Sequence, residues 1–214
     1  MISRSVTLLA VSALTLSAAL LAGCDNKPTQ GKSTAEVGAA VTSAAPATGT
    51  PYKITQADSK IGFVGAKVTG KHEGSFGTFS GTVHVPGGDL TKGSVAVEID
   101  VASVTTDTPR LTGHLKTDEI LDVAKFPKAR FTSTSVKAGG EKGATHTVTG
   151  NFELHGVTKS ITFPATIRAT DAKVEVDAEF GINRKDFGVV YPGKPDDLIK
   201  DEVLIKLTIR AAKG

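Results

Sequence analysis

The chain contains, at residues 173–183, the stretch KVEVDAEFGIN, in which apolar and polar side chains alternate. Side chains two residues apart lie on the same face of a β-strand, whereas a helix repeats every 3.6 residues. The stretch therefore predicts a strand with one apolar face and one face in water. The apolar face carries Val174, Val176, Ala178, Phe180 and Ile182.

The same alternation recurs along the chain from residue 60 to residue 211. It is clear at residues 79–85, 94–101, 146–156, 161–167 and 203–211, and weaker at residues 60–69 and 129–136. Together with residues 173–183 these runs predict eight strands. The connections are mostly short and turn-like, such as PGGD at residues 86–89. Short links between half-polar strands favour antiparallel pairing.

Eight antiparallel strands close naturally into an up-and-down barrel, which removes exposed strand edges. The sequence therefore predicts an all-β, eight-stranded antiparallel barrel. A two-sheet sandwich is the alternative, because many sandwiches also lack the core Trp and the cysteine pair that this chain lacks.

The predicted inward positions combine large and small apolar residues. An eight-stranded barrel is either just filled by its side chains or holds one small ligand. Small residues between aromatic ones leave room for an elongated apolar guest, although they also suit the taper of a filled barrel. The large inward residues are Phe63, Phe79, Phe152, Phe163, Phe180 and Ile182, and the small ones are Gly65, Gly81, Gly150, Ala165 and Ala178.

A charged stretch at residues 114–131 interrupts the strand pattern. Its apolar residues at positions 120, 121, 123, 124 and 126 suit a short helix that lays one face on the barrel. Thr117 is a suitable N-cap, the acids at 118 and 119 suit the first turn, and Pro127 ends the helix. We expect a helical plug across one barrel end.

A second irregular stretch, residues 183–201, is long enough to be a functional lid over the barrel. Phe187 is expected to turn inward. For Arg184 two interpretations remain: it pins the loop together with Asp186, or it meets a polar or phosphorylated head group of a ligand.

Composition excludes several functions. The formal net charge is +3, no basic run is present, and aromatic residues are 5% of the chain, so nucleic-acid binding has no support. The five histidines show no metal-ligand spacing. No nucleophile elbow or phosphate-binding glycine loop occurs. We therefore expect neither a metal site nor catalytic residues, and no enzyme activity.

The first 23 residues have the pattern of a secretory signal peptide. Arg4 precedes an apolar core that ends in the sequence LAGC at residues 21–24. This end resembles a bacterial lipobox, which implies that Cys24 is lipidated and tethers the protein to the periplasmic face of a membrane. Asp25 resembles an inner-membrane retention signal. An uncleaved membrane anchor and simple secretion are the alternatives.

The next segment, residues 24–50, carries many Ala, Ser, Thr, Gly and Pro residues and no aromatic one. Because so little apolar surface cannot offset the entropy of ordering, we expect a flexible tether. The barrel domain then spans residues 51–214.

Four stretches of the domain together resemble the YceI-like family of bacterial polyisoprenoid- or lipid-binding proteins. They are HLKTDEILDVAKFPKARFTSTSV from residue 114, VTGNFELHGVTKSITFP from 148, FGINRKDFGV from 180 and DEVLIKLTI from 201. The resemblance implies a lipocalin-like barrel with a long apolar tunnel that carries an isoprenoid or fatty-chain ligand. This chain departs from the family in its opening TQADSK, residues 55–60, and in Glu119 to Leu121, where an aromatic pair is usual.

The two remaining functional hypotheses differ in what fills the barrel. In the first, the protein binds and carries an elongated apolar lipid: a polyisoprenoid, an isoprenoid quinone or a fatty-chain compound. In the second, the barrel is filled by its own side chains and serves as an envelope scaffold for a protein partner that the sequence does not identify.

Overall fold

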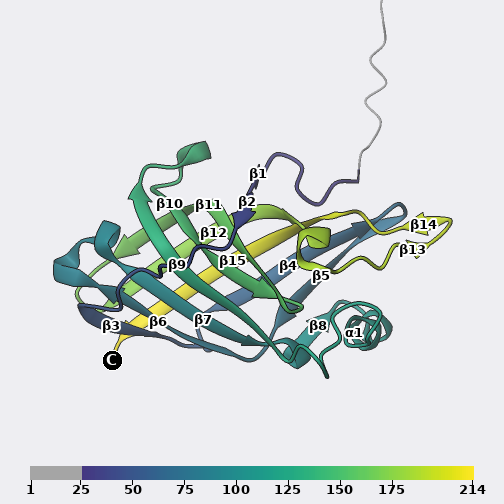
Figure 1. Cartoon of the computed structure of the whole chain (residues 1–214), viewed down its shortest axis with the longest axis horizontal. Coiled ribbons are helices and arrows are strands. Elements are labelled where there is room, and N and C mark those ends of the chain that lie inside the picture. The colour runs from purple at the N-terminus through teal and green to yellow at the C-terminus, as the bar shows by residue number, and fades with distance from the viewer. Residues whose placement is uncertain (1–25) are drawn as a thin grey trace, which may run out of the picture.

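We analysed a computed structural model of the chain, which describes residues 26–214. The signal peptide, Cys24 and Asp25 lie outside the described residues. Within residues 26–214, eight strands form a closed antiparallel ring (Figure 1). In ring order they are β12 (Lys173–Asn183), β11 (Val157–Ala169), β10 (His146–Leu154), β9 (Lys128–Ala138), β7 (Ser94–Asp100), β6 (Phe79–Val85), β3 (Thr50–Ile54) and β15 (Glu202–Lys213).

The ring closes through β15, which pairs with three strands. One edge of β15 pairs with the whole of β12. Its other edge pairs first with β4 (Lys60–Lys67) and then, near the C-terminus, with β3. The predicted all-β barrel is therefore confirmed.

The eighth strand of the ring differs from the predicted one. β3 occupies that place, whereas β4 lies beside it and begins a side sheet with β5 (Gly70–Phe76) and β8 (Val104–Thr106). The pattern missed β3 because its five residues bury only Tyr52 and Ile54. It missed β5 because GKHEGSF places no apolar residues in alternation.

The segment expected to be a flexible tether contains two strands that complete the barrel wall. β11 pairs with β12 only over Thr166–Ala169 and Val174–Asp177, and the rest of the two facing edges is open. β1 (Ser33–Thr34) pairs in parallel with β12, and β2 (Glu36–Ala39) pairs antiparallel with β11. We call residues 26–45 the strap. The prediction of a flexible tether was wrong for these residues.

A short alternation of buried and exposed residues explains why the strap packs on the barrel. Ala35 is 5% exposed and packs in one cluster with Phe163 and Phe180, whereas Thr34 and Glu36 face water. The Ala35 N–H donates to the Gly181 carbonyl at 2.8 Å. The composition of the strap did not predict this pairing, because an open strand edge offers hydrogen bonds to a backbone of almost any sequence.

Side chains hold the strap along its length. Asn26 donates to the Lys67 carbonyl at 3.1 Å, and Thr29 donates to the Glu202 carboxylate. Further along, the Val41 N–H donates to the Asn151 side-chain oxygen, and the Asn151 amide donates back to the Val41 carbonyl. The strap is thus fixed at both ends as well as in its strands.

The predicted helical plug lies earlier in the chain than expected. Helix α1 is Pro109–Leu115, with Thr108 as its N-cap. Residues 117–126 are turns, and Asp122 has a φ of 43°, which interrupts a helix. Thr108 followed by Pro109 is the better start, because proline at the first helical position lacks only an N–H that would be unpaired anyway. Ile120 and Leu121 are nevertheless buried, so the stretch does cover one barrel end.

The predicted lid, residues 183–201, is an ordered loop. It contains the 3-10 turn η5 (Arg184–Phe187) and a small hairpin of β13 (Gly193–Lys194) and β14 (Asp197–Leu198). The hairpin, α1 and the tip joining β4 to β5 lie at one end of the barrel, at the right of Figure 1. The remaining 3-10 turns are η1 (Pro86–Gly88), η2 (Leu90–Lys92), η3 (Val101–Ser103) and η4 (Glu141–Gly143).

Arg184 holds this loop by hydrogen bonds to its backbone. Its guanidinium donates to the Val189 carbonyl at 2.6 Å and to the Lys200 carbonyl at 3.1 Å. Longer contacts reach the Ile199 carbonyl at 3.5 Å and the Asp201 carboxylate at 3.4 Å. Asp186 is exposed and takes no part in these contacts. These contacts match the interpretation in which Arg184 pins the loop, without Asp186.

We predict that Ala35→Asp detaches the strap from the barrel. A buried, unpaired carboxylate costs more than about 1.4 kcal/mol, which corresponds to a factor of ten in the opening equilibrium. Hydrogen exchange at residues 35–39 should therefore accelerate at least about tenfold. The matched control is Thr34→Asp, at the neighbouring exposed position on β1, which should leave exchange nearly unchanged. Equal exchange in the two variants would show that the strap is not packed as described.

We predict that Arg184→Met destabilises the domain. The carbonyls of Val189 and Lys200 lose their partner, and a buried unpaired acceptor costs about 1–3 kcal/mol. The urea concentration at the midpoint of unfolding should fall clearly. Lys185→Met is the control, because it makes the same replacement one residue later and removes an exposed ion pair with Asp201 worth about 0–1 kcal/mol. Similar midpoints for both variants would contradict the assigned role.

Candidate functional site

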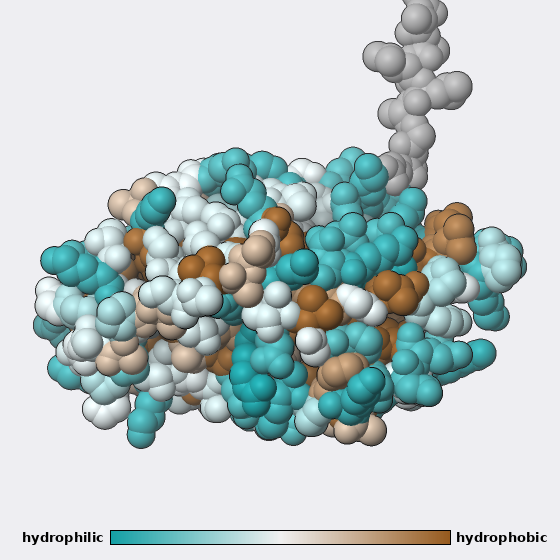
Figure 2. Space-filling model, in the orientation of Figure 1, coloured by the Kyte–Doolittle hydropathy of each residue, from teal (hydrophilic) through white to brown (hydrophobic). Residues whose placement is uncertain are grey.

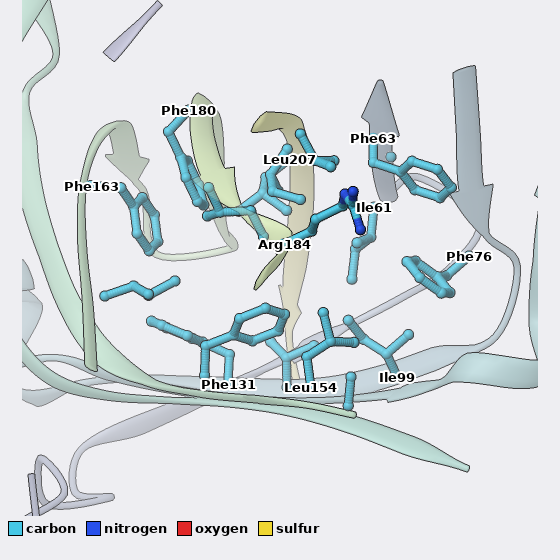
Figure 3. Close-up of a pocket in the computed structure, with 18 of the residues that line it drawn as sticks. Ile61, Phe63, Phe76, Ile99, Phe131, Leu154, Phe163, Phe180, Arg184 and Leu207 are labelled. Atoms are coloured by element: carbon cyan, nitrogen blue, oxygen red, sulfur yellow. The ribbon is translucent and has the colours of Figure 1, made fainter. Parts of the chain in front are cut away.

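An elongated cavity of about 800 Å³ occupies the barrel interior. This volume lies within the range of about 300–1,000 Å³ that is usual for small-molecule sites. Figure 3 shows apolar side chains from opposite walls facing one another across it, with Phe131, Leu154 and Ile99 on one side and Phe163, Phe180 and Leu207 on the other. The middle of the cavity is therefore an apolar space.

Six of the nine residues proposed as ligand contacts line this cavity. They are Phe63, Phe152, Phe163, Phe180, Ile182 and Arg184.

The other three are buried elsewhere. Phe79 packs in the core at the start of β6, and its carbonyl accepts a hydrogen bond from Gln56. Ala178 borders a separate, smaller depression. Phe187 is fully buried behind Phe152, with ring centroids 5.1 Å apart. Phe187 thus supports a wall of the cavity without reaching it.

Several lining residues were missed by the sequence analysis. They include Ile61, Phe76, Ile99, Phe131, Leu154, Tyr191 and Leu207. The alternation does place Ile99, Leu154 and Leu207 on apolar strand faces, although none of them was proposed as a ligand contact. The sequence pattern did not identify Phe131. Strand β9 shifts register against β10 at Thr149 and Gly150, and the alternation of β9 breaks there.

The small inward residues have different roles. A Cβ at Gly150 would lie 2.5 Å from the Phe131 ring, so this glycine makes room for a neighbouring side chain. At Gly81 a Cβ would meet the Ala96 carbonyl at 2.5 Å. Gly65, in contrast, lines the cavity, and a Cβ there meets no atom within 4 Å. Among these three glycines, Gly65 is the one that leaves space in the cavity.

Three phenylalanine rings contact one another in series from one side of the cavity to the other. Phe163 and Phe180 stack with centroids 4.1 Å apart, and Phe131 lies 5.7 Å from Phe163. Phe163 on β11 and Phe180 on β12 lie where the strap covers the gap between these two strands, and Phe131 reaches them from β9. The strap therefore supports the wall formed by Phe163 and Phe180 from the gap.

The two ends of the cavity differ. Near η1 and η2 none of the lining residues is exposed, and Val85, Gly93 and Ser94 are buried, so we call this the closed end. Near α1 and the β13–β14 hairpin the lining includes the exposed residues Arg110 and Lys194. The cavity therefore reaches the surface at this second end, which we call the open end.

Polar groups gather at the open end. Lys67 pairs with Asp197 at 2.6 Å, and the hydrogen bond from this ammonium lowers the pKa of the Asp197 carboxyl. The His114 ring meets Tyr191 edge-on with centroids 5.0 Å apart, and its Nε2 lies 2.7 Å from the Glu119 carboxylate. A ligand with an apolar chain and a polar head would thus have its head here.

Arg184 lies between the loop and the cavity and is 6% exposed. In Figure 3 its side chain lies beside Ile61. Burial lowers the pKa of the guanidinium, and the nearby Asp201 carboxylate opposes this effect. With its donors directed to carbonyls of the loop, Arg184 adds a largely satisfied cation to the cavity wall.

Residues 26–214 contain no group of three His, Cys, Asp or Glu side chains placed to bind a metal ion. In the same part of the chain, no helix has the length and hydropathy needed to cross a bilayer.

The sequence matches the family model of the YceI-like domain over residues 52–211. The UPF0312 protein of Pseudomonas fluorescens (strain SBW25) is 30% identical over 182 residues, which cover 79% of this chain and 92% of the relative. The UPF0312 protein of Pseudomonas syringae pv. tomato is 35% identical over 126 residues, or 56% of this chain and 65% of that protein.

Solved structures share the fold. BcnA of Burkholderia cenocepacia superposes with a TM-score of 0.65 at 26% identity, covering 74% of this chain and 99% of that one. A polyisoprenoid binding domain from Saccharophagus degradans gives a TM-score of 0.61 at 18% identity, covering 76% and 98%. The matches in sequence and in fold agree with the motifs identified above, and the chain belongs to the YceI-like family.

Proposed function

We propose that this protein binds one elongated apolar lipid in its barrel and carries it without chemical change. The observation that supports this most directly is the cavity of about 800 Å³ with a mainly apolar lining. Protein interiors are otherwise close-packed, and side chains that face an empty space lose their dispersion contacts. A chain-like guest would restore those contacts along the whole barrel.

The energetics suit a ligand held by its chain. Each buried methylene contributes roughly 0.8 kcal/mol, so about ten carbons supply roughly 8 kcal/mol before association costs. This gain would correspond to an affinity on the order of micromolar before the cost of association is subtracted, and a longer buried chain is needed to offset that cost. The head group would then set orientation at the open end, where the polar residues gather.

The ligand class we propose is a polyisoprenoid, an isoprenoid quinone or a fatty-chain compound. The Saccharophagus degradans neighbour is described as a polyisoprenoid binding domain, and it shares the fold of this chain. The size of the cavity argues against the alternative of a filled barrel that serves only as a scaffold.

We also propose that the protein works at the bacterial cell envelope. The signal-like residues 1–23 and the lipobox-like end at Cys24 support export and lipid anchoring on the periplasmic side. Asp25 supports retention at the inner membrane.

The first test is native mass spectrometry of the full chain, exported and processed in a bacterial host and released into mild detergent. We expect a stoichiometric adduct in addition to any covalent modification, and solvent extraction should identify it as a polyprenyl or fatty-chain compound. A bare protein mass that stays unchanged after incubation with isoprenoid quinones and fatty amides would overturn the proposal.

We predict that Gly65→Leu reduces lipid occupancy, because the new side chain has room to fill part of the cavity without a clash. Gly38→Leu is the matched control: this glycine also has open space at its Cβ but lies on β2 outside the cavity. Occupancy is read from the adduct fraction in native mass spectra. If both folded variants keep the full adduct, the lipid lies elsewhere.

A further inference from the structure

Exposed aliphatic residues gather at the open end of the cavity. Of the four large hydrophobic residues exposed among the described residues, Val68 (56%), Val190 (61%) and Leu198 (49%) belong to this end, and Val41 (43%) lies on the strap. The Val68 N–H donates to the Leu198 carbonyl at 3.2 Å, so these two residues are neighbours. Single exposed aliphatics are common, but a group of them beside a cavity mouth indicates an interaction surface.

Space-filling shows the same arrangement. In Figure 2 hydrophobic areas alternate with hydrophilic ones at the end of the molecule that carries the β13–β14 hairpin in Figure 1. We call Val68 on the β4–β5 tip, together with Val190 and Leu198 on the loop of residues 183–201, the apolar rim.

Cationic side chains also lie at the open end. Lys71, Lys194 and Arg110 are exposed there, and such side chains lay their stems along apolar surface while their charge stays in water. Asp107 and Asp196 carry the opposite charge at the same end. Attraction to an anionic surface is therefore modest, and burial of aliphatic side chains is the main favourable term.

The strap fixes where the chain enters the domain. Asn26 donates to the carbonyl of Lys67, at the end of β4 next to Val68. Cys24 precedes Asn26 by only two residues, which span at most about 7 Å when fully extended. A lipid on Cys24 would therefore hold the open end close to the bilayer. A tether that was flexible up to residue 50 would leave the orientation free.

From these observations we propose that the open end docks on the surface of a lipid bilayer. Val68, Val190 and Leu198 insert among the head groups, the nearby cations lie at the level of the phosphates, and the cavity mouth faces the membrane. A lipid chain can then pass between bilayer and barrel without crossing water. This inference rests on the proposed lipid-carrying function.

The test uses the absence of tryptophan from the chain. The full-length lipidated protein carrying Leu198→Trp is reconstituted into phosphatidylethanolamine–phosphatidylglycerol vesicles whose acyl chains are brominated near the head group. We expect quenching and a blue shift of the single Trp. Lys92→Trp is the control, because Lys92 lies on η2 at the closed end and its side chain is 72% exposed. Its fluorescence should stay unquenched.

Equal quenching at the two positions, or none at position 198, would overturn the docking proposal. Lipid extraction from the same preparations separates this failure from failure of the proposed function. Bound lipid without quenching at position 198 rejects docking alone. Quenching at position 198 without bound lipid rejects carriage and leaves docking in place. A blue shift at position 198 without bromine quenching, as expected if a protein surface covers this residue instead of lipid, also rejects the bilayer as the partner.

A second set of variants tests the rim without an added aromatic residue. In the double variant Val68→Ser and Leu198→Ser, transfer of a fluorescent fatty-chain lipid from vesicles to the protein should slow several-fold. Val41→Ser removes a similarly exposed aliphatic residue from the strap and should leave the rate unchanged. An unchanged rate in the double variant would contradict insertion of the rim.

Discussion

The hydrogen bonding of β15 is the constraint on which the rest of the structure depends. One edge of this strand pairs with all of β12, and its other edge is shared between β4 and β3. The first pairing closes the sheet, and the shared edge sends β4, β5 and β8 outward as a side sheet. A closed sheet satisfies its backbone internally, so its interior does not have to be filled with polar groups or water. An apolar cavity can therefore persist inside it.

Closure is incomplete between β11 and β12, and the strap completes it. The cavity wall formed by Phe163 and Phe180 lies at this gap, with Ala35 packed against the same cluster. The segment that repairs the wall also determines where the N-terminal part of the chain leaves the domain, through the contact of Asn26 with Lys67. The strap thus both completes the cavity wall and, in the proposed anchored protein, orients the domain toward the membrane. An anchored carrier gains from this link, because its open end stays near the lipid source.

The strands could be predicted because their signal is local. In residues 173–183 a period of two is sufficient to place Phe180 and Ile182 inside, since no other regular structure has that repeat. The strap could not be predicted from composition, because its stability comes from the open edges of β11 and β12, which are distant in sequence. Gly150 shows why the cavity lining could not be predicted fully. Whether a glycine leaves space for a ligand or for the Phe131 ring depends on the neighbouring strand. For Arg184 the sequence left two interpretations open, because its backbone partners follow from a turn that the pattern does not encode.

The central claim is that an apolar chain lies along the inside of the barrel. Methyl NMR of the protein tests it most directly, with a soluble fatty-chain amide titrated below its micelle concentration. We predict shift changes and ligand contacts at the methyl groups of Ile99, Leu154 and Leu207, which line the cavity. Contacts confined to the exposed methyl groups of Val68, Val190 and Leu198, with the interior unchanged, would contradict the account.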